Sequence, residues 1–244
     1  MSSFLTGAKP ILVAVALLLT ASDVTVAEGG ELNAQQVLER STAVYRAAET
    51  YVDTGVVETV YITGTNERIG TTRFKTAYVA PRDFRFESRM NDFGGPDVVF
   101  AIGQNAAGVE AWFSSQPSLT KDIDTVQAAI DTGAGVSRDT TTMVPGILFP
   151  GSKLGGDIVE LTDVTRRDDE VIDKVDCYRL EGFRWPNTGS PTTVWIDKET
   201  FLIRRVYEEQ DLRNLQTRTT WTFRPQLNEP VPADALHFDL AGFQ

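Results

Sequence analysis

From Gly55 onward, apolar side chains recur at every second position over most of the chain, and this period constrains the fold more than any other feature. Apolar and charged residues alternate along Phe84–Met90, and aromatic residues alternate with arginines and threonines along Thr217–Arg224. Such alternation is typical of antiparallel strands with one face on a core and one face in water. Short turn-like connections separate most of the runs, so neighbouring runs are expected to pair antiparallel.

Two segments depart from this period. Asn33 and Gln36 form a capping-box pair in front of a helix that is expected to run to about Thr50. The second departure is an insertion at about residues 116–156, with several Gly and Pro residues and a short helical pattern that Asp122 is expected to cap. Strands are expected to resume at 157–165, and the last one is expected at 236–240. We therefore predict a mainly β fold with helices (α+β), in which a strongly curved antiparallel sheet of about eleven strands carries the helix and the insertion on one face.

The first 27 residues have the features of a cleaved secretory signal. Lys9 precedes Ile11–Leu19, an uncharged apolar run that is too short to span a bilayer as a helix, for which about 20 residues are needed. Small residues at Thr25–Ala27 predict cleavage after Ala27. The alternative is an N-terminal membrane anchor, and the length and flanks of the run favour export. We expect residues 1–27 to be a signal peptide and 28–244 a single exported domain without an integral membrane segment.

Charge and cysteine content exclude several classes of protein. The net charge is −11, and it stays −11 without the expected leader, which carries Lys9 and Asp23. Such a chain is a poor partner for nucleic acid, since that binding rests on neutralising phosphates, and the same charge argues against adhesion to an anionic membrane. The single cysteine, Cys177, rules out a framework of internal disulfides, and we expect a buried, inert thiol.

The residues give little support for catalysis. A lone histidine, His237, excludes a His-rich metal site, and we predict neither a metal nor a cofactor. Cys177 and His237 remain an alternative as nucleophile and base of a hydrolase. The carboxylate pairs Asp168–Asp169, expected in a turn, and Glu208–Glu209, expected at a strand end, are interpreted as solvated surface. We therefore predict no catalytic residues and a protein that is not an enzyme.

Several segments together resemble a known family. They are VLERSTAVYRAAETYVDTG (37–55), APRDFRFE (80–87), the strand at Cys177–Leu180, TTVWIDKETFLIRRVYEE (192–209) and FRPQLNEPVPADALHFDL (223–240). In this order they resemble the LolA/LolB-like superfamily of bacterial envelope proteins, most closely the outer-membrane lipoprotein-sorting type and its periplasmic relatives.

The resemblance implies a half-open antiparallel barrel, a half-barrel whose mouth is closed by the N-terminal helix and the lid insertion. In that family the concave face holds acyl chains or another hydrophobic ligand. Mapped onto this chain, the lining candidates are Phe84, Phe86, Trp195, Trp221 and Phe223. The lid candidates are Met143, Val144, Ile147, Leu148 and Phe149. Ordinary core packing is the alternative for the aromatic residues, and a packed loop is the alternative for the lid run.

The leading hypothesis is a periplasmic binding or carrier protein for a lipid, a lipoprotein acyl chain or another hydrophobic ligand. The first alternative is a periplasmic sensor or regulatory domain that binds another envelope protein. The second is the hydrolase that would use Cys177 and His237.

Overall fold

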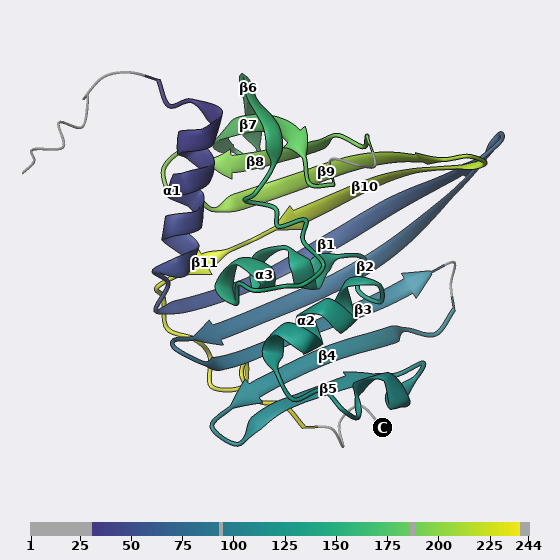
Figure 1. The fold of residues 1–244 in the computed structure, drawn as a ribbon, viewed down its shortest axis with the longest axis vertical. Coiled ribbons are helices and arrows are strands. Elements are labelled where there is room, and N and C mark those ends of the chain that lie inside the picture. The colour runs from purple at the N-terminus through teal and green to yellow at the C-terminus, as the bar shows by residue number, and fades with distance from the viewer. Residues whose placement is uncertain (1–30, 93–94, 186–188, 240–244) are drawn as a thin grey trace, which may run out of the picture. The chain divides into compact units, whose positions relative to one another are not determined.

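Eleven antiparallel strands form one curved sheet, not closed into a barrel, in the computed structural model, which describes residues 31–92, 95–185 and 189–239 (Figure 1). The order across the sheet is β5-β4-β3-β2-β1-β10-β9-β8-β7-β6, and β11 pairs with the start of β1. The predicted fold class is confirmed. The strands are β1 (Thr50–Thr63), β2 (Asn66–Val79), β3 (Asp83–Asp92), β4 (Val98–Asn105), β5 (Gly108–Phe113), β6 (Thr162–Ile172), β7 (Val175–Phe183), β8 (Thr192–Asp197), β9 (Ile203–Leu212), β10 (Leu215–Phe223) and β11 (Gln226–Leu227).

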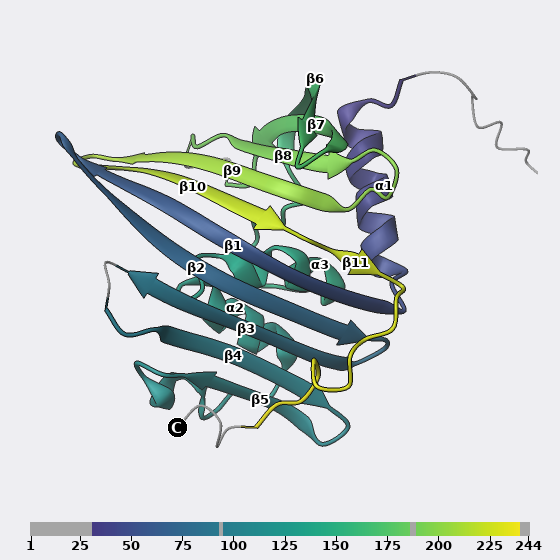
Figure 2. The ribbon, with the colours of Figure 1, turned by 180° about the vertical axis from the view of Figure 1, so that it is seen from behind.

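The described helices all lie on one side of the sheet, which we call the inner face, and Figure 2 shows the opposite outer face without a helix on it. Val57, Phe86 and Leu180 point inward and belong to the main buried apolar cluster. Their strand neighbours point to the outer face, because successive side chains of a strand alternate. The inner face is therefore where a ligand could be enclosed.

The helix α1 (Ala34–Arg46) begins at the predicted capping box. The Asn33 side chain accepts a hydrogen bond from the Gln36 backbone N–H at 2.9 Å, and the Asn33 N–H donates to Gln36 Oε1 at 3.0 Å. Val37, Leu38 and Tyr45 are buried against the sheet. The helix thus packs across the ends of several strands, as Figure 1 shows.

We expect Asn33→Ala to lower the free energy of unfolding by about 1 kcal/mol, because the Gln36 backbone N–H loses its side-chain acceptor. For a chain of this size, that corresponds to a melting temperature lower by about 2–4 °C in a thermal scan. Gln35→Ala is the matched control, since Gln35 is exposed on the same first turn and bonds only to the Glu39 side chain. Equal shifts for the two variants would contradict a specific capping role.

The lid segment, residues 117–156, consists of short helices joined by irregular chain. They are η1 (Pro117–Thr120), α2 (Val126–Ala134), η2 (Thr140–Thr142) and α3 (Val144–Leu148). The cap of α2 is Thr125, whose hydroxyl oxygen accepts from the Ala128 N–H at 3.2 Å. Asp122, which was expected to cap this helix, lies three residues before the observed cap.

Three local predictions were wrong. Asp168 and Asp169 lie inside β6, beside a break in its register with β7, and the turn falls instead at Asp173–Lys174, where both residues have positive φ. The first of the strands predicted after the insertion, at 157–165, begins only at Thr162. The strand expected at 236–240 is a turn followed by irregular chain over its described part, and the last strand is β11.

The predicted signal peptide lies outside the described residues. Among the residues that are described, no helix is both long enough and apolar enough to cross a bilayer.

Candidate functional site

An aromatic cluster joins the lid segment to the inner face of the sheet. The ring of Phe149, just after α3, packs edge-on against Phe84 with 4.9 Å between the ring centroids. It makes a second edge contact with Tyr78 at 5.4 Å. Across the sheet, Phe74 and Phe223 form a similar pair at 5.4 Å. The lid segment therefore rests directly on the predicted lining.

The other lid candidates also pack against the main apolar cluster. Met143, Val144 and Ile147 are buried in the main apolar cluster, and Leu148 packs against it while partly exposed. The run forms a short helix, α3, with Pro145 in its first turn, where proline is tolerated because the backbone N–H there has no partner within the helix. The buried apolar side chains of α3 belong to the main apolar cluster.

A buried arginine connects the lid segment to the sheet through an ion pair and hydrogen bonds, a set of contacts that we call a clasp. Arg184, just after β7, pairs with Glu208 on β9 at 3.1 Å, and both side chains are almost completely buried. The same guanidinium donates from Nε to the Gly156 carbonyl at 2.7 Å and from Nη2 to Thr142 Oγ1 at 3.0 Å. Glu208 also accepts from Thr192 Oγ1 at 3.1 Å. One ion pair therefore joins three strands to two points of the lid segment.

The glycine in this clasp is required by its surroundings. Gly156 has a φ of +75°, and a Cβ atom there would lie 2.4 Å from the Trp185 ring. A side chain at this position would push the Gly156 carbonyl away from Arg184.

A second clasp lies at the other side of the lid segment. Arg138, between α2 and η2, pairs with Asp92 at the end of β3 and lies over the Tyr61 ring. Trp221 on β10 donates its indole N–H to the Arg138 carbonyl at 2.9 Å. Arg138 and Asp139 both have positive φ, so the chain turns sharply here. Burial raises the pKa of Asp139, which lies near the Arg184–Glu208 pair.

A third polar group lies beneath α1. The Tyr51 hydroxyl donates to Asp53 Oδ2 at 3.0 Å, and the Arg224 N–H donates to Asp53 Oδ1 at 2.8 Å. The Tyr45 hydroxyl accepts from the Ile203 N–H at 2.9 Å, and the two tyrosine rings pack edge-on at 5.6 Å. Burial raises the pKa of Asp53 to about 7, despite these hydrogen bonds.

Hollows lie at the margins of the lid segment. One, of about 490 Å³, lies beside Phe149 between the start of α2 and the turns at Pro81 and residues 104–109. A smaller one, of about 180 Å³, lies beside Arg138 and Trp221 and is also lined by Thr59, Thr217 and Thr219. The first is next to the aromatic cluster and therefore the better candidate for an entrance.

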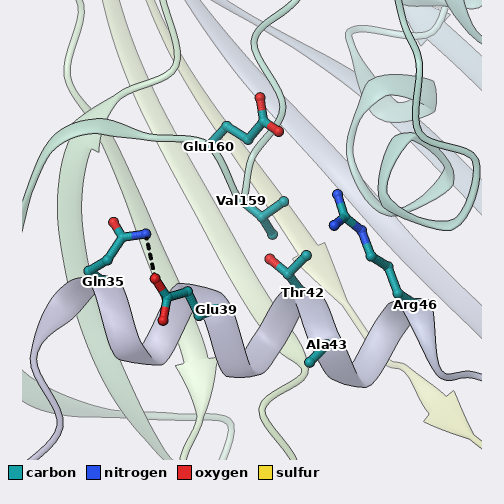
Figure 3. Close-up of a pocket in the computed structure, with 7 residues that line it drawn as sticks. All are labelled: Gln35, Glu39, Thr42, Ala43, Arg46, Val159 and Glu160. Atoms are coloured by element: carbon teal, nitrogen blue, oxygen red, sulfur yellow. Dashed lines mark hydrogen bonds between the residues drawn. The ribbon is translucent and has the colours of Figure 1, made fainter.

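A further hollow of about 420 Å³ lies between α1 and the chain before β6 (Figure 3). It is lined by Gln35, Glu39, Thr42, Ala43, Arg46, Val159 and Glu160. Figure 3 shows the hydrogen bond between Gln35 and Glu39, and the Arg46 and Glu160 side chains on its two sides. Its polar and charged lining does not suit an apolar ligand.

The structure brings together four of the five predicted lining residues. Phe84, Phe86, Trp221 and Phe223 are buried in the cluster on the inner face. Trp195 is not among them: it belongs to a separate buried cluster with Ile172 and Cys177. The neighbours Val194 and Ile196 point inward, so Trp195 points to the outer face and cannot line the enclosed side.

The pair proposed for hydrolysis is not brought together. Cys177 lies on β7, and burial raises the pKa of its thiol to about 11. His237 precedes Phe238, whose ring abuts Gly103 on β4, and six strands separate β4 from β7 in the sheet. Within the described ranges, no group of three or more His, Cys, Asp or Glu residues is arranged to hold a metal ion.

Sequence reasoning missed the buried polar residues Arg184, Glu208 and Asp53. Glu208 was interpreted as solvated, yet it is only 3% exposed. The sequence did contain a signal for their burial. Glu208 is two residues after Val206, and Asp53 is four residues before Val57, so each charged side chain points to the same face of its strand as an apolar one. A charged residue at an inward position needs a buried partner.

No family model matches the sequence, and no curated protein matches it. Solved structures resemble the fold. A chain in the MucA/MucB complex of Pseudomonas aeruginosa is 12% identical, with 84% of this chain and 61% of that chain covered and a TM-score of 0.47. This chain therefore spans less than two thirds of that relative.

Two other structures are matched over nearly their whole length. LprF from Mycobacterium bovis is 14% identical, with 82% of this chain and 94% of that chain covered and a TM-score of 0.46. A LolA superfamily protein from Nitrosomonas europaea is 12% identical, with 85% and 99% covered and a TM-score of 0.34. The LolA-like fold expected from the motifs is represented among these structures, and the likeness is one of fold alone.

Proposed function

We propose that this protein is an exported, non-catalytic binding protein of the bacterial envelope that holds a lipid or an acyl chain between the inner face and the lid segment. One observation carries the proposal. A broad apolar sheet face is covered by short helical turns that are held by side-chain clasps instead of by a β-ladder. Burial of an apolar ligand there would contribute roughly 25 cal/mol per Å² of apolar surface.

The structure corresponds to the closed form in this proposal. Phe149 touches Phe84 and Tyr78 directly, so a ligand would have to displace the lid segment and take over these contacts. The hollow of about 490 Å³ beside Phe149 is the point at which an acyl chain would enter. The Arg138–Asp92 pair and the Trp221–Arg138 hydrogen bond would then break or shift.

The test uses tryptophan fluorescence of residues 28–244 titrated with a long-chain fatty acid. We expect an emission change that is mostly lost in Trp221→Phe, because Trp221 is bonded to the lid segment. Trp195→Phe is the matched control, since Trp195 is also buried but lies on the outer face. Native mass spectrometry of the protein from its own envelope, followed by organic extraction, would identify the natural ligand.

Two results would overturn the proposal. The first is an apo mass together with no uptake of the fatty acid. The second is an emission change that Trp195→Phe removes and Trp221→Phe retains, because the ligand would then bind the outer face. The first result would favour the alternative of a domain that binds another envelope protein.

A further inference from the structure

The net charge of −11 argued against adhesion to an anionic membrane, but basic side chains gather locally on the outer face of the central strands. Arg73 lies opposite Val56, and Lys75 lies opposite Thr54, in the pairing of β1 with β2. Arg205 lies opposite Thr222 in the pairing of β9 with β10, and Arg224 bonds through its N–H to the Thr54 carbonyl. Neighbouring strands lie about 4.8 Å apart, so Lys75 and Arg224 are about 10 Å apart across β1, and Arg73 and Arg205 are about 14 Å apart across β1 and β10. The four cations therefore form two adjacent rows across the outer face, which we call the outer-face patch.

Most of these charges have no carboxylate partner. Arg73, Lys75 and Arg224 are exposed, and none of the three side chains has a salt bridge or hydrogen bond to another described residue. Arg205 lies over the Trp195 ring, with 5.9 Å from its guanidinium carbon to the ring centroid. The patch is therefore free to attract an anion from outside.

Acidic side chains near the patch do not neutralise it. Glu87 is buried and already paired with Arg85 at 2.7 Å and with Arg89 at 2.6 Å. Glu58 is exposed on the outer face of β1, two residues from Val56, and Asp234 lines the same hollow as Lys75. Glu67 lies further along β2. The four cations outnumber the two nearby acids Glu58 and Asp234, and at about 0.1 M salt a charge more than about 10 Å away, such as that of Glu67, is largely screened.

An apolar strip adjoins the cations. Val56, Val60 and Ile62 occupy outward positions of β1 and lie outside the buried cluster. Ile69, opposite Val60 on β2, is 56% exposed. Figure 2 shows this face of β1, β2, β9 and β10 with no helix over it. Apolar side chains on the water-facing side of a polar sheet, flanked by cations, are the combination that suits a lipid–water interface.

We propose that the outer face of the central strands docks onto a bilayer that carries anionic headgroups. The exposed cations would contact the headgroups while Ile69 and Val60 reach the interfacial layer. The apolar strip favours a bilayer over an acidic polypeptide, which would need only the cations. This proposal is independent of ligand binding on the inner face.

The test is co-sedimentation of residues 28–244 with vesicles of phosphatidylcholine, with and without about a third phosphatidylglycerol, at low and high salt. We expect binding only to the anionic vesicles, and weaker binding at high salt. The triple variant Arg73→Glu/Lys75→Glu/Arg224→Glu is expected to bind at least about tenfold more weakly, since each basic residue near the surface contributes to the attraction. Circular dichroism verifies that each variant is folded.

A matched control separates the patch from net charge. Arg82→Glu/Lys121→Glu/Lys153→Glu changes the net charge equally, at exposed positions in loops away from the outer-face patch, and is expected to bind like the parent. Equal loss in both triple variants, or no binding to anionic vesicles at low salt, would overturn the proposal. Binding of polyglutamate without binding of vesicles would also overturn it and would assign the patch to an acidic protein partner.

Discussion

Replacing Arg184 with methionine is expected to lower the free energy of unfolding by about 3–5 kcal/mol, because it leaves the Glu208 carboxylate buried without its cation. Glu208 would keep only the hydrogen bond from Thr192. The Gly156 carbonyl and the Thr142 hydroxyl would lose their donor in the same step. Urea unfolding followed by circular dichroism measures the difference.

The loss is expected to be partly recovered in Arg184→Met/Glu208→Gln, since a neutral amide is less costly to bury than a carboxylate. Arg218→Met is the control on the surface. Arg218 also pairs with a β9 carboxylate, Glu209, at 3.6 Å, but both side chains are more than a third exposed. Exposed pairs contribute about 0–1 kcal/mol. A loss in Arg184→Met no larger than that of Arg218→Met would show that the buried pair does not hold the lid segment.

The face of each strand could be predicted from the sequence wherever the two-residue period is regular. In β3, the inward positions Phe84 and Phe86 are buried and the outward positions Arg85 and Arg89 reach water, as the alternation predicts. The same rule places Trp195 on the outer face between two inward residues. The family resemblance placed Trp195 in the lining, whereas the two-residue period alone places it on the outer face, where the structure has it.

The buried polar contacts could not be predicted because they depend on pairings between distant segments. Arg184 and Glu208 are 24 positions apart and meet only because β7, β8 and β9 form consecutive hairpins. Asp53 receives a hydrogen bond from Arg224, 171 positions away, through the pairing of β1 with β10. Periodicity shows that a charge points inward, but the identity of its partner depends on strand order.

Asp53 is expected to make the protein less stable as the pH rises from about 4 to about 7. Its pKa in the folded protein is about 7, against 3.8 for the ordinary carboxyl group, because the side chain is almost wholly buried. The folded state therefore binds a proton more tightly than the unfolded state over this range. The stability that this proton provides is complete below pH 3.8 and is lost as the pH rises through 7.

The size of the effect follows from the difference between the two pKa values. At 1.36 kcal/mol for each unit, the loss amounts to about 4 kcal/mol. Asp53→Asn is expected to remove it, since the amide oxygen still accepts from the Arg224 N–H and the Tyr51 hydroxyl can turn to accept from the amide nitrogen. The variant and the parent should be similarly stable near pH 4, and the variant should be more stable near pH 8.

Asp197→Asn provides a control of opposite sign. Burial alone would raise the pKa of Asp197, but hydrogen bonds from Arg204 at 2.6 Å and from the Glu199 N–H at 2.9 Å lower it below its usual value. Its contribution to stability is therefore present above pH 3.8 and is lost as the pH falls through the folded pKa. Replacing Asp197 should destabilise the protein near pH 7 and matter less in acid. The free energy of unfolding should therefore be measured from pH 3 to pH 9 for Asp53→Asn and for the parent. If the two proteins showed the same dependence on pH, the Asp53 carboxyl group would not hold a proton more tightly in the folded state, and this proton would not contribute to stability.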